Sequence, residues 1–402
     1  MNMPSKSKYP IRNLVTEGFM EYMQYGMNGS GISRNTDYES WKYNRHFVSQ
    51  AMMTPEFSYK VIERTIGLYE EMESYWNNLE ENRELDLKKW IYRFTNEIVF
   101  EILTGVKNNS VACYYSTLIH NDSLSLNEKE TERFIQSLEI FDRGNYLFDK
   151  INNIIKERRI EIENTPLNQP LRHDLLTSYL TANTPRDINF AKHGNADFLR
   201  PMTESEIFGN VFDSLLGGGT MSNLICFVIY HIETYPEVKQ RIRQEIETVL
   251  GNDLTTPITS KDLDELRYCD AVIKEVHRYH PISFSIPRVN VEKDEIGGIS
   301  WPEKTSFQML YGVIMKNKNY WTDPEKFDPD RFYELEKSEK YLLERQHIKD
   351  SFTIWGGGIR ICPGRKWAII ELKILLSMIY RKYDIEIADI NEPFKSGSGL
   401  LR

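Results

Sequence analysis

The chain has 402 residues, of which 40% are hydrophobic and 27% are charged. This composition is typical of a folded globular protein and excludes an intrinsically disordered chain. The net charge of -9 argues against a protein that coats nucleic acid, because that role requires a basic surface.

The chain opens on a polar and basic segment, residues 1–10, which lacks the apolar stretch of a signal peptide. No apolar run approaches the roughly 18 residues that a membrane helix requires, and the best of them is 224–230. The sequence therefore predicts no membrane span in this chain. The cysteines lie far apart without a C-x-x-C pair, which favours a reducing compartment; they are Cys113, Cys226, Cys269 and Cys362.

The first 200 residues show the apolar spacing of helices. Hydrophobic residues recur with a period of 3.6 over 57–77 and 85–103, which predicts two amphipathic helices. A stretch rich in proline and asparagine, 164–200, predicts a long connection that contains one short helix near 173–181.

A long helix is predicted next. Thr203 and Glu206 form a T-x-x-E capping box, and Pro236 prevents the helix from continuing. Its interior contains LLGGGT, residues 215–220, where each glycine costs about 1 kcal/mol relative to alanine. The glycines indicate either tight packing of the helix or a local opening where a ligand approaches the backbone beside Thr220.

Short strands follow a second pair of helices. The helices are predicted at 237–250 and 263–279, and the strands at 286–291, 295–300 and 306–311. The predicted fold class is therefore mainly α with a small β-sheet.

The stretch SFTIWGGGIRICPGRKWAIIELK, residues 351–373, places Cys362 just before a predicted helix, 365–382. A helix N-terminus favours the thiolate form that binds metals. Glycines 356–358 would let the loop lie flat against a planar ligand, and Arg360 would reach a carboxylate on its edge. A lone cysteine is usually a small hydrophobe, and a glycine-rich loop before a helix can also bind phosphate. The combination favours a haem, with its central iron and two propionates.

This loop resembles the cysteine-ligand loop of the cytochrome P450 superfamily, the haem-thiolate monooxygenases, whose pattern is F-x-x-G-x-R-x-C-x-G. Trp355 replaces the phenylalanine and keeps an aromatic ring near the sulfur. Four further family motifs occur in the right order: W-x-x-x-R, [AG]-G-x-[DE]-T, E-x-x-R and P-x-R-F. They fall on Trp41 and Arg45, Gly217 and Thr220, Glu275 and Arg278, and Arg331.

The resemblance implies a cytochrome P450-like helical fold, with a single domain over 1–402 in which 1–40 form a substrate-loop region. It implies haem b with Cys362 as the axial ligand of the iron. It also implies that Thr220 is the catalytic hydroxyl, which binds dioxygen and delivers protons. Taken alone, W-x-x-x-R is better explained by a packed tryptophan and a surface arginine, but in this order it implies contacts with the propionates. The residues implied for those contacts are Arg360, Arg288, Trp41 and Arg45, beside a structural network of Glu275, Arg278 and Arg331.

One family position differs in this chain. The acidic residue that usually precedes the distal threonine is Gly219 here. Asp213 lies two helical turns earlier, about 10 Å along the axis, so it cannot replace that acid directly. A water molecule lodged beside the glycines could do so.

As a family member, the chain would insert one oxygen atom of O2 into a small apolar organic substrate. Electrons would come from NADPH through a separate flavoprotein reductase, because the chain has no convincing dinucleotide motif. Arg365, Lys366 and Lys42 form either a basic docking face or ordinary solvated charges. Apolar residues of the segment after 281, together with the tail SGSGLL, are expected to wall the substrate pocket; those named are Ile282, Phe284 and Ile286.

Two other functions remain open. A haem-thiolate isomerase or dehydratase acts on a peroxide without outside electrons, and the missing acid at Gly219 is compatible with it. A non-catalytic, truncated haem-binding protein is the third hypothesis.

The family motifs also indicate a shortened chain. The W-x-x-x-R helix begins at Trp41, far earlier than usual, and the tail after Gly397 stops where a final hairpin is expected. We expect the sequence to be a fragment of a longer protein; the alternative is a naturally shortened one. The expected location is the reducing, cytosolic side of the cell, on the endoplasmic reticulum membrane if a longer form carries an anchor.

Overall fold

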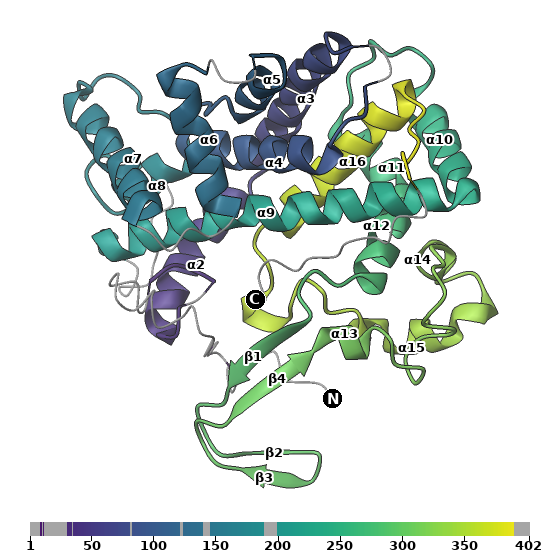
Figure 1. Ribbon diagram of the computed structural model, residues 1–402. Coiled ribbons are helices and arrows are strands. Elements are labelled where there is room, and N and C mark those ends of the chain that lie inside the picture. The colour runs from purple at the N-terminus through teal and green to yellow at the C-terminus, as the bar shows by residue number, and fades with distance from the viewer. Residues whose placement is uncertain are drawn as a thin grey trace.

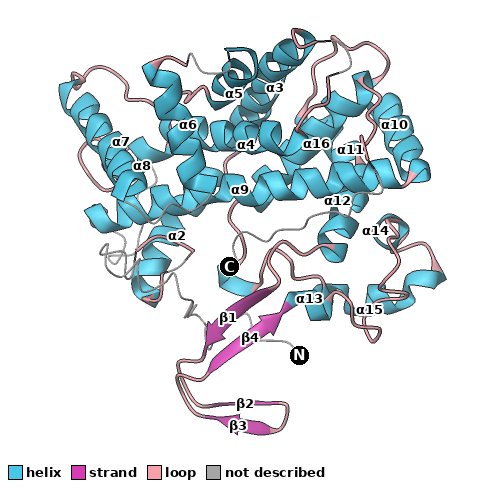
Figure 2. Cartoon of the chain, viewed as in Figure 1, coloured by secondary structure: helices cyan, strands magenta, loops and turns pink. Residues whose placement is uncertain are grey.

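The computed structural model describes residues 9, 11, 30–33, 35–80, 83–120, 124–139, 145–188 and 199–389. Helices make up most of this part, and short strands gather at one end of it (Figures 1 and 2). The prediction of a mainly α fold with a small sheet is confirmed. The substrate-loop region at 1–40 falls mostly outside the described residues, and the tail after 389 lies outside them entirely.

The helices before the long central one begin and end at recognisable local signals. In α3, Thr54 Oγ1 accepts a hydrogen bond from the Phe57 amide and Pro55 occupies the first turn. Helix α4 ends at Gly105, whose φ of +65° suits glycine. The bounds are α2 Tyr38–Met52, α3 Pro55–Asn77, α4 Leu87–Thr104, α5 Ser110–His120, α6 Leu126–Glu139, α7 Asn145–Asn164 and α8 Leu175–Thr181.

Helix α9, Glu204–Thr234, runs across the middle of the molecule, with α4 alongside it (Figure 1). The predicted capping box is present, since Thr203 Oγ1 accepts from the Glu206 amide and Glu206 Oε2 accepts from the Thr203 amide. Among the described helices, α9 alone has the length and apolar composition of a membrane span. It also packs against α4, α7, α8 and α12, and a core helix passes the same test.

The rest of the chain contains more breaks than the sequence indicated. The helix predicted at 263–279 is two helices separated by Leu266, whose ψ of 74° is not helical. Thr259 caps the first of the two with its own capping box. The strand predicted at 295–300 is a hairpin whose turn is Gly297 and Gly298, both with positive φ. The bounds are α10 Pro236–Leu250, α11 Ser260–Glu265, α12 Arg267–Tyr279, β1 Ser285–Val289, β2 Asp294–Ile296, β3 Ile299–Trp301, β4 Ser306–Leu310, α13 Tyr311–Ile314, α14 Asp330–Tyr333, α15 Leu342–Ser351 and α16 Arg365–Lys382.

The strands form two separate antiparallel pairs. Strand β1 pairs with β4, with Ser285 opposite Leu310 and Val289 opposite Ser306. Strands β2 and β3 form the outer hairpin. Both pairs lie on the side of α9 away from α4 (Figure 2).

A buried ion network fixes α12 to the chain that follows the strands. Arg278 donates two hydrogen bonds to Glu275, at 2.7 and 2.8 Å, and the Asp328 amide donates to the same carboxylate at 2.9 Å. Arg278 also donates to the carbonyls of Met315 and Pro324. The Glu275 and Arg278 side chains are fully buried, so their hydrogen-bonding partners offset the cost of removing the two charges from water.

Arg331 joins this network, as the P-x-R-F motif implied, but its main partner is a residue that the sequence did not indicate. Its Nε lies 3.5 Å from Glu275 Oε2, whereas its Nη1 donates a hydrogen bond to Glu344 of α15. Glu344 also accepts from the Thr322 amide at 2.7 Å and is fully buried. The network therefore contains two carboxylates and two guanidinium groups.

Replacing Glu344 tests this arrangement. Glu344→Gln removes one of two buried negative charges and leaves Arg331 with a single distant carboxylate, so we expect the free energy of unfolding to fall by about 3–5 kcal/mol. Urea unfolding followed by circular dichroism measures the change. The control is Glu325→Gln, which breaks an exposed pair with Lys316 and should leave the unfolding midpoint in place. Equal midpoints for both variants would contradict the role given to Glu344.

Candidate functional site

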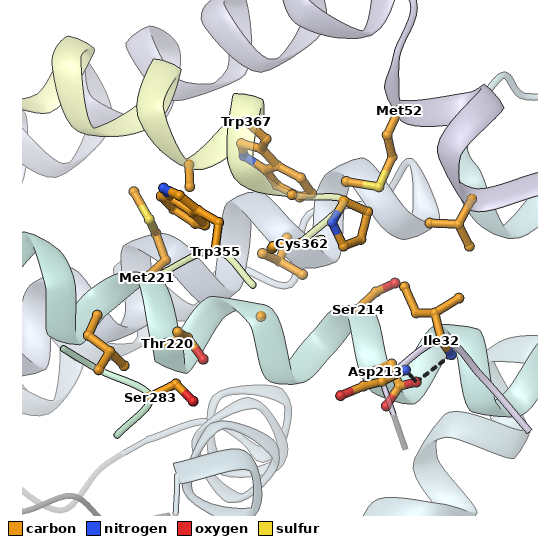
Figure 3. A pocket seen from close by; sticks show the side chains of 18 of the residues that line it. Ile32, Met52, Asp213, Ser214, Thr220, Met221, Ser283, Trp355, Cys362 and Trp367 are labelled. Atoms are coloured by element: carbon orange, nitrogen blue, oxygen red, sulfur yellow. Dashed lines mark hydrogen bonds between the residues drawn. The ribbon is translucent and has the colours of Figure 1, made fainter. Parts of the chain in front are cut away.

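A cavity of about 360 Å³ lies between α9 and the loop before α16 (Figure 3). Five of the six predicted site residues line it: Cys362, Arg360, Thr220, Trp41 and Arg45. The sixth, Arg288, is buried on β1 and is not among the lining residues, so the structure does not bring it to the cavity. Much of the remaining wall is apolar, including Val48, Met52, Val99, Met221 and Leu224.

The cysteine loop is held by its own backbone. The Cys362 amide donates to the Trp355 carbonyl at 2.8 Å, which closes the loop just before α16. Gly356 and Gly358 have φ values of +77° and +60°, a region that other residues rarely adopt. None of glycines 356–358 is among the residues that line the cavity, so their contact with a ligand stays a prediction. Gly356 and Gly358 are needed for the turn itself, because both have positive φ values.

The central glycines of α9 divide between two roles. Gly217 and Thr220, three residues apart, line the cavity and are exposed within an otherwise mostly buried helix. Gly218 faces α4, where an added Cβ would lie 2.8 Å from Asn96 Oδ1. The Thr95 hydroxyl donates to the Gly218 carbonyl at 3.0 Å. Because α9 is helical throughout, Gly218 serves tight packing, and no break occurs in the helix.

Gly219, which occupies the position of the family's acidic residue, also faces away from the cavity. An added Cβ on Gly219 would lie 3.4 Å from the Tyr92 ring, and Gly219 is not a lining residue. Asp213 of α9 does line the cavity, beside Ile32 of the N-terminal segment (Figure 3).

Arg360 and Trp41 support one another. The guanidinium carbon of Arg360 lies 4.0 Å from the centre of the Trp41 ring, a cation–π contact. Arg360 Nη2 donates to the Asn35 carbonyl at 3.1 Å, and Trp41 Nε1 donates to the Ile32 carbonyl at 3.2 Å. These bonds hold Arg360 at the cavity wall, where its positive charge faces the same space as Arg45.

Two titratable residues of the wall were missed from the sequence. His277 is 5% exposed, and burial lowers the pKa of its imidazole to about 3, so the ring is neutral. It packs edge-on against Trp355, with 5.0 Å between ring centres. Glu371 of α16 is 1% exposed, and burial raises the pKa of its carboxyl to about 8. The sequence could have indicated both residues. Glu371 interrupts an apolar run of α16, and His277 lies inside the E-x-x-R motif.

Two of the three residues expected to wall a substrate pocket lie at the cavity. Ile282 and Ile286 line the cavity, together with Ser283. Phe284 does not; its side chain is half-exposed and packs over Gly312, where a Cβ would meet the ring at 2.0 Å. Strict alternation would place Phe284 on the same face as Ile282 and Ile286. The bends at Ile282 and Ser283 break that pattern, and Phe284 points away from the cavity.

The expected docking face is exposed in part. Arg365 and Lys366 are exposed at the start of α16, beside the cysteine loop. Lys42 of α2 is 39% exposed and forms an ion pair with Glu39 at 3.7 Å.

The chemistry of the cavity fits a haem. It presents one thiol, two guanidinium groups and apolar walls, which match an iron, two carboxylates and a flat ring. Gly217 adds room, because a Cβ there would meet nothing within 4 Å. No cluster of three or more His, Cys, Asp or Glu residues that could hold a metal occurs in the described part of the chain. A single thiolate from Cys362 would suit an iron that is already held by a macrocycle.

Comparison with known proteins gives a consistent result. The family model for cytochrome P450 matches residues 6–401. The chain is 33% identical to probable cytochrome P450 4d20 of Drosophila melanogaster over 46% of its length, and 24% identical to human cytochrome P450 3A7 over 76%. It spans 35% and 60% of the lengths of these two relatives.

A solved structure agrees at the level of fold. The crystal structure of a cytochrome P450 (CYP102L1) superposes with a TM-score of 0.71 at 20% identity, covering 95% of this chain and 80% of that one. The match of the family model to nearly the whole chain, with the motif residues gathered around one cavity, shows that the chain belongs to the cytochrome P450 family.

Proposed function

We propose that the chain is a haem-thiolate monooxygenase that oxidises a small apolar organic compound with O2. One observation carries this proposal: Cys362 and Thr220, from a loop and a helix far apart in sequence, line the same largely apolar cavity. A cysteine ligand on one wall and a hydroxyl on another are the two groups that this chemistry requires of the protein.

The side chains then have distinct tasks. Haem bound in the cavity would supply the redox chemistry that activates O2. Cys362 would hold the iron through its thiolate, and Arg360 and Arg45 would pair with the propionates. The Thr220 hydroxyl would hold a proton on the substrate side, where Gly217 leaves space for a small molecule. Ile282 and Ile286 would exclude water around an apolar substrate.

The electron source is a second protein in this proposal. Electrons would pass from NADPH through a flavoprotein reductase, whose acidic surface would meet Arg365 and Lys366 beside the cysteine loop. Charge complementarity of this kind predicts that the rate of reduction falls as salt concentration rises.

A second function is favoured by one observation. Gly219 offers no acidic side chain beside Thr220, so a haem-thiolate isomerase or dehydratase, which needs no outside electrons, remains a candidate. Consumption of NADPH in the presence of a reductase distinguishes the two.

Replacing Cys362 tests the ligand. Cys362→Ser removes the thiolate while keeping the size of the side chain. We expect the red-shifted absorption band of the reduced carbon monoxide complex, a property of thiolate-ligated haem, to disappear. Cys226→Ser is the matched control, because Cys226 does not line the cavity and its variant should keep the band. A Cys362→Ser spectrum identical to the wild type would refute the assignment.

Replacing Thr220 tests the proton path. Thr220→Ala removes the hydroxyl that would direct protons to the bound oxygen. The share of electrons lost as hydrogen peroxide should therefore rise by about twofold or more. The measurement is peroxide formed per NADPH consumed, with a fluorogenic compound that the wild type oxidises. Ser222→Ala, whose hydroxyl bonds back to the Gly219 carbonyl at 2.9 Å, is the control on the same helix. Equal peroxide yields in all three proteins would remove Thr220 from the proton path.

A further inference from the structure

The N-terminal segment Ser30–Ser33 crosses α9 at unusually close range. A Cβ on Gly209 of α9 would lie 2.5 Å from the Gly31 amide nitrogen and 2.9 Å from the Ser30 carbonyl carbon. Gly31 has a φ of +75°, and a Cβ there would lie 2.8 Å from the Gly209 carbonyl oxygen. Two glycines, one on each element, therefore allow backbone to pass against backbone.

One turn further along α9, a carboxylate binds the same segment. Asp213 Oδ2 accepts hydrogen bonds from the amides of Ile32 and Ser33, both at 2.8 Å (Figure 3 shows the bond to Ile32). An oxygen that accepts from two successive amides makes charge-assisted bonds, which are stronger than neutral ones. Asp213, Ile32 and Ser33 all line the cavity.

The segment is also tied to the opposite side of the cavity. The Ile32 carbonyl accepts from Trp41 Nε1 of α2, and Asn35 Nδ2 donates to the Gly31 carbonyl at 3.1 Å. The Asn35 carbonyl in turn accepts from Arg360 of the cysteine loop. Ser30–Ser33 therefore bridges the helix that carries Thr220 and the loop that carries Cys362.

We propose that Asp213 is a specificity-determining positioning residue: its carboxylate clamps Ser30–Ser33 onto α9 and so fixes the Ile32 wall of the substrate pocket. The role of Asp213 is then unrelated to the absence of an acidic side chain at Gly219. Asp213 acts through the backbone of the N-terminal segment and not on a proton path. The effect on ligand selection rests on the proposed haem site, whereas the clamp itself does not.

Hydrogen exchange tests the clamp without haem. Asp213→Asn keeps the shape of the side chain but removes its charge, so the Ile32 and Ser33 amides should exchange about tenfold faster or more. Gly209→Ala keeps the carboxylate and favours the helix, yet its methyl group pushes Ser30 and Gly31 away, so the same two amides should exchange faster. Gly67→Ala is the control, because a Cβ on this α3 glycine meets nothing within 4 Å. If Asp213→Asn does not fold, Gly209→Ala decides alone.

Ligand selection tests the consequence. The probes are imidazole and 1-phenylimidazole, titrated by the absorbance change of the haem-loaded protein. Loss of the Ile32 wall in Asp213→Asn should raise the dissociation constant of 1-phenylimidazole by about fivefold, because the phenyl ring loses apolar contact. The dissociation constant of imidazole should stay within about twofold of the wild-type value. Ser222→Ala, a substitution on the same helix at a residue that does not line the cavity, should keep the wild-type ratio.

The outcomes separate the two claims. Wild-type exchange at Ile32 and Ser33 in both Asp213→Asn and Gly209→Ala overturns the clamp. Faster exchange with an unchanged ratio of the two dissociation constants overturns the role in specificity. A wild-type chain that binds neither haem nor azole defeats the proposed function and the role in specificity, while the exchange result still decides the clamp.

Discussion

The burial of four charged groups around α12 is the constraint on which the site depends. Glu275, Arg278, Arg331 and Glu344 are almost wholly removed from water, so each must keep its partners for the fold to be stable. Their bonds attach α12 to the chain around 315–331 and to α15. The neighbouring residue on α12, His277, packs on Trp355, and the Trp355 carbonyl accepts from the Cys362 amide. A buried charge network thus supports the loop that carries Cys362.

The other side of the cavity depends on close packing. Gly218 lets α9 approach α4, and this packing turns Gly217 and Thr220 toward the cavity. Ser30–Ser33 then crosses α9 at Gly209 and reaches the side of Arg360 through Asn35 and Trp41. The cavity is therefore bounded by segments from the start, the middle and the end of the chain, and hydrogen bonds such as that from Arg360 to the Asn35 carbonyl join them.

Local chemistry made the central elements predictable. The ends of α9 follow from a capping box and a proline, and the cysteine loop follows from a motif within a few residues. What differs from the prediction depends on tertiary packing: Phe284 turns outward, and Leu266 separates α11 from α12. The propionate contact expected of Arg288 stays a prediction, although this residue is not in the cavity wall. Glu344 and the clamp at Asp213 were missed because their partners, Arg331 and the amides of Ile32 and Ser33, are joined to them only by the fold. The propionate contacts of Trp41, Arg45 and Arg360 remain predictions.

The central claim is that the sulfur of Cys362 binds iron. Iron-edge X-ray absorption of the haem-loaded wild-type chain addresses it most directly, because sulfur and nitrogen scatter differently at bonding distance. The account predicts one sulfur neighbour beside the four porphyrin nitrogens. An iron surrounded only by nitrogen and oxygen would contradict it.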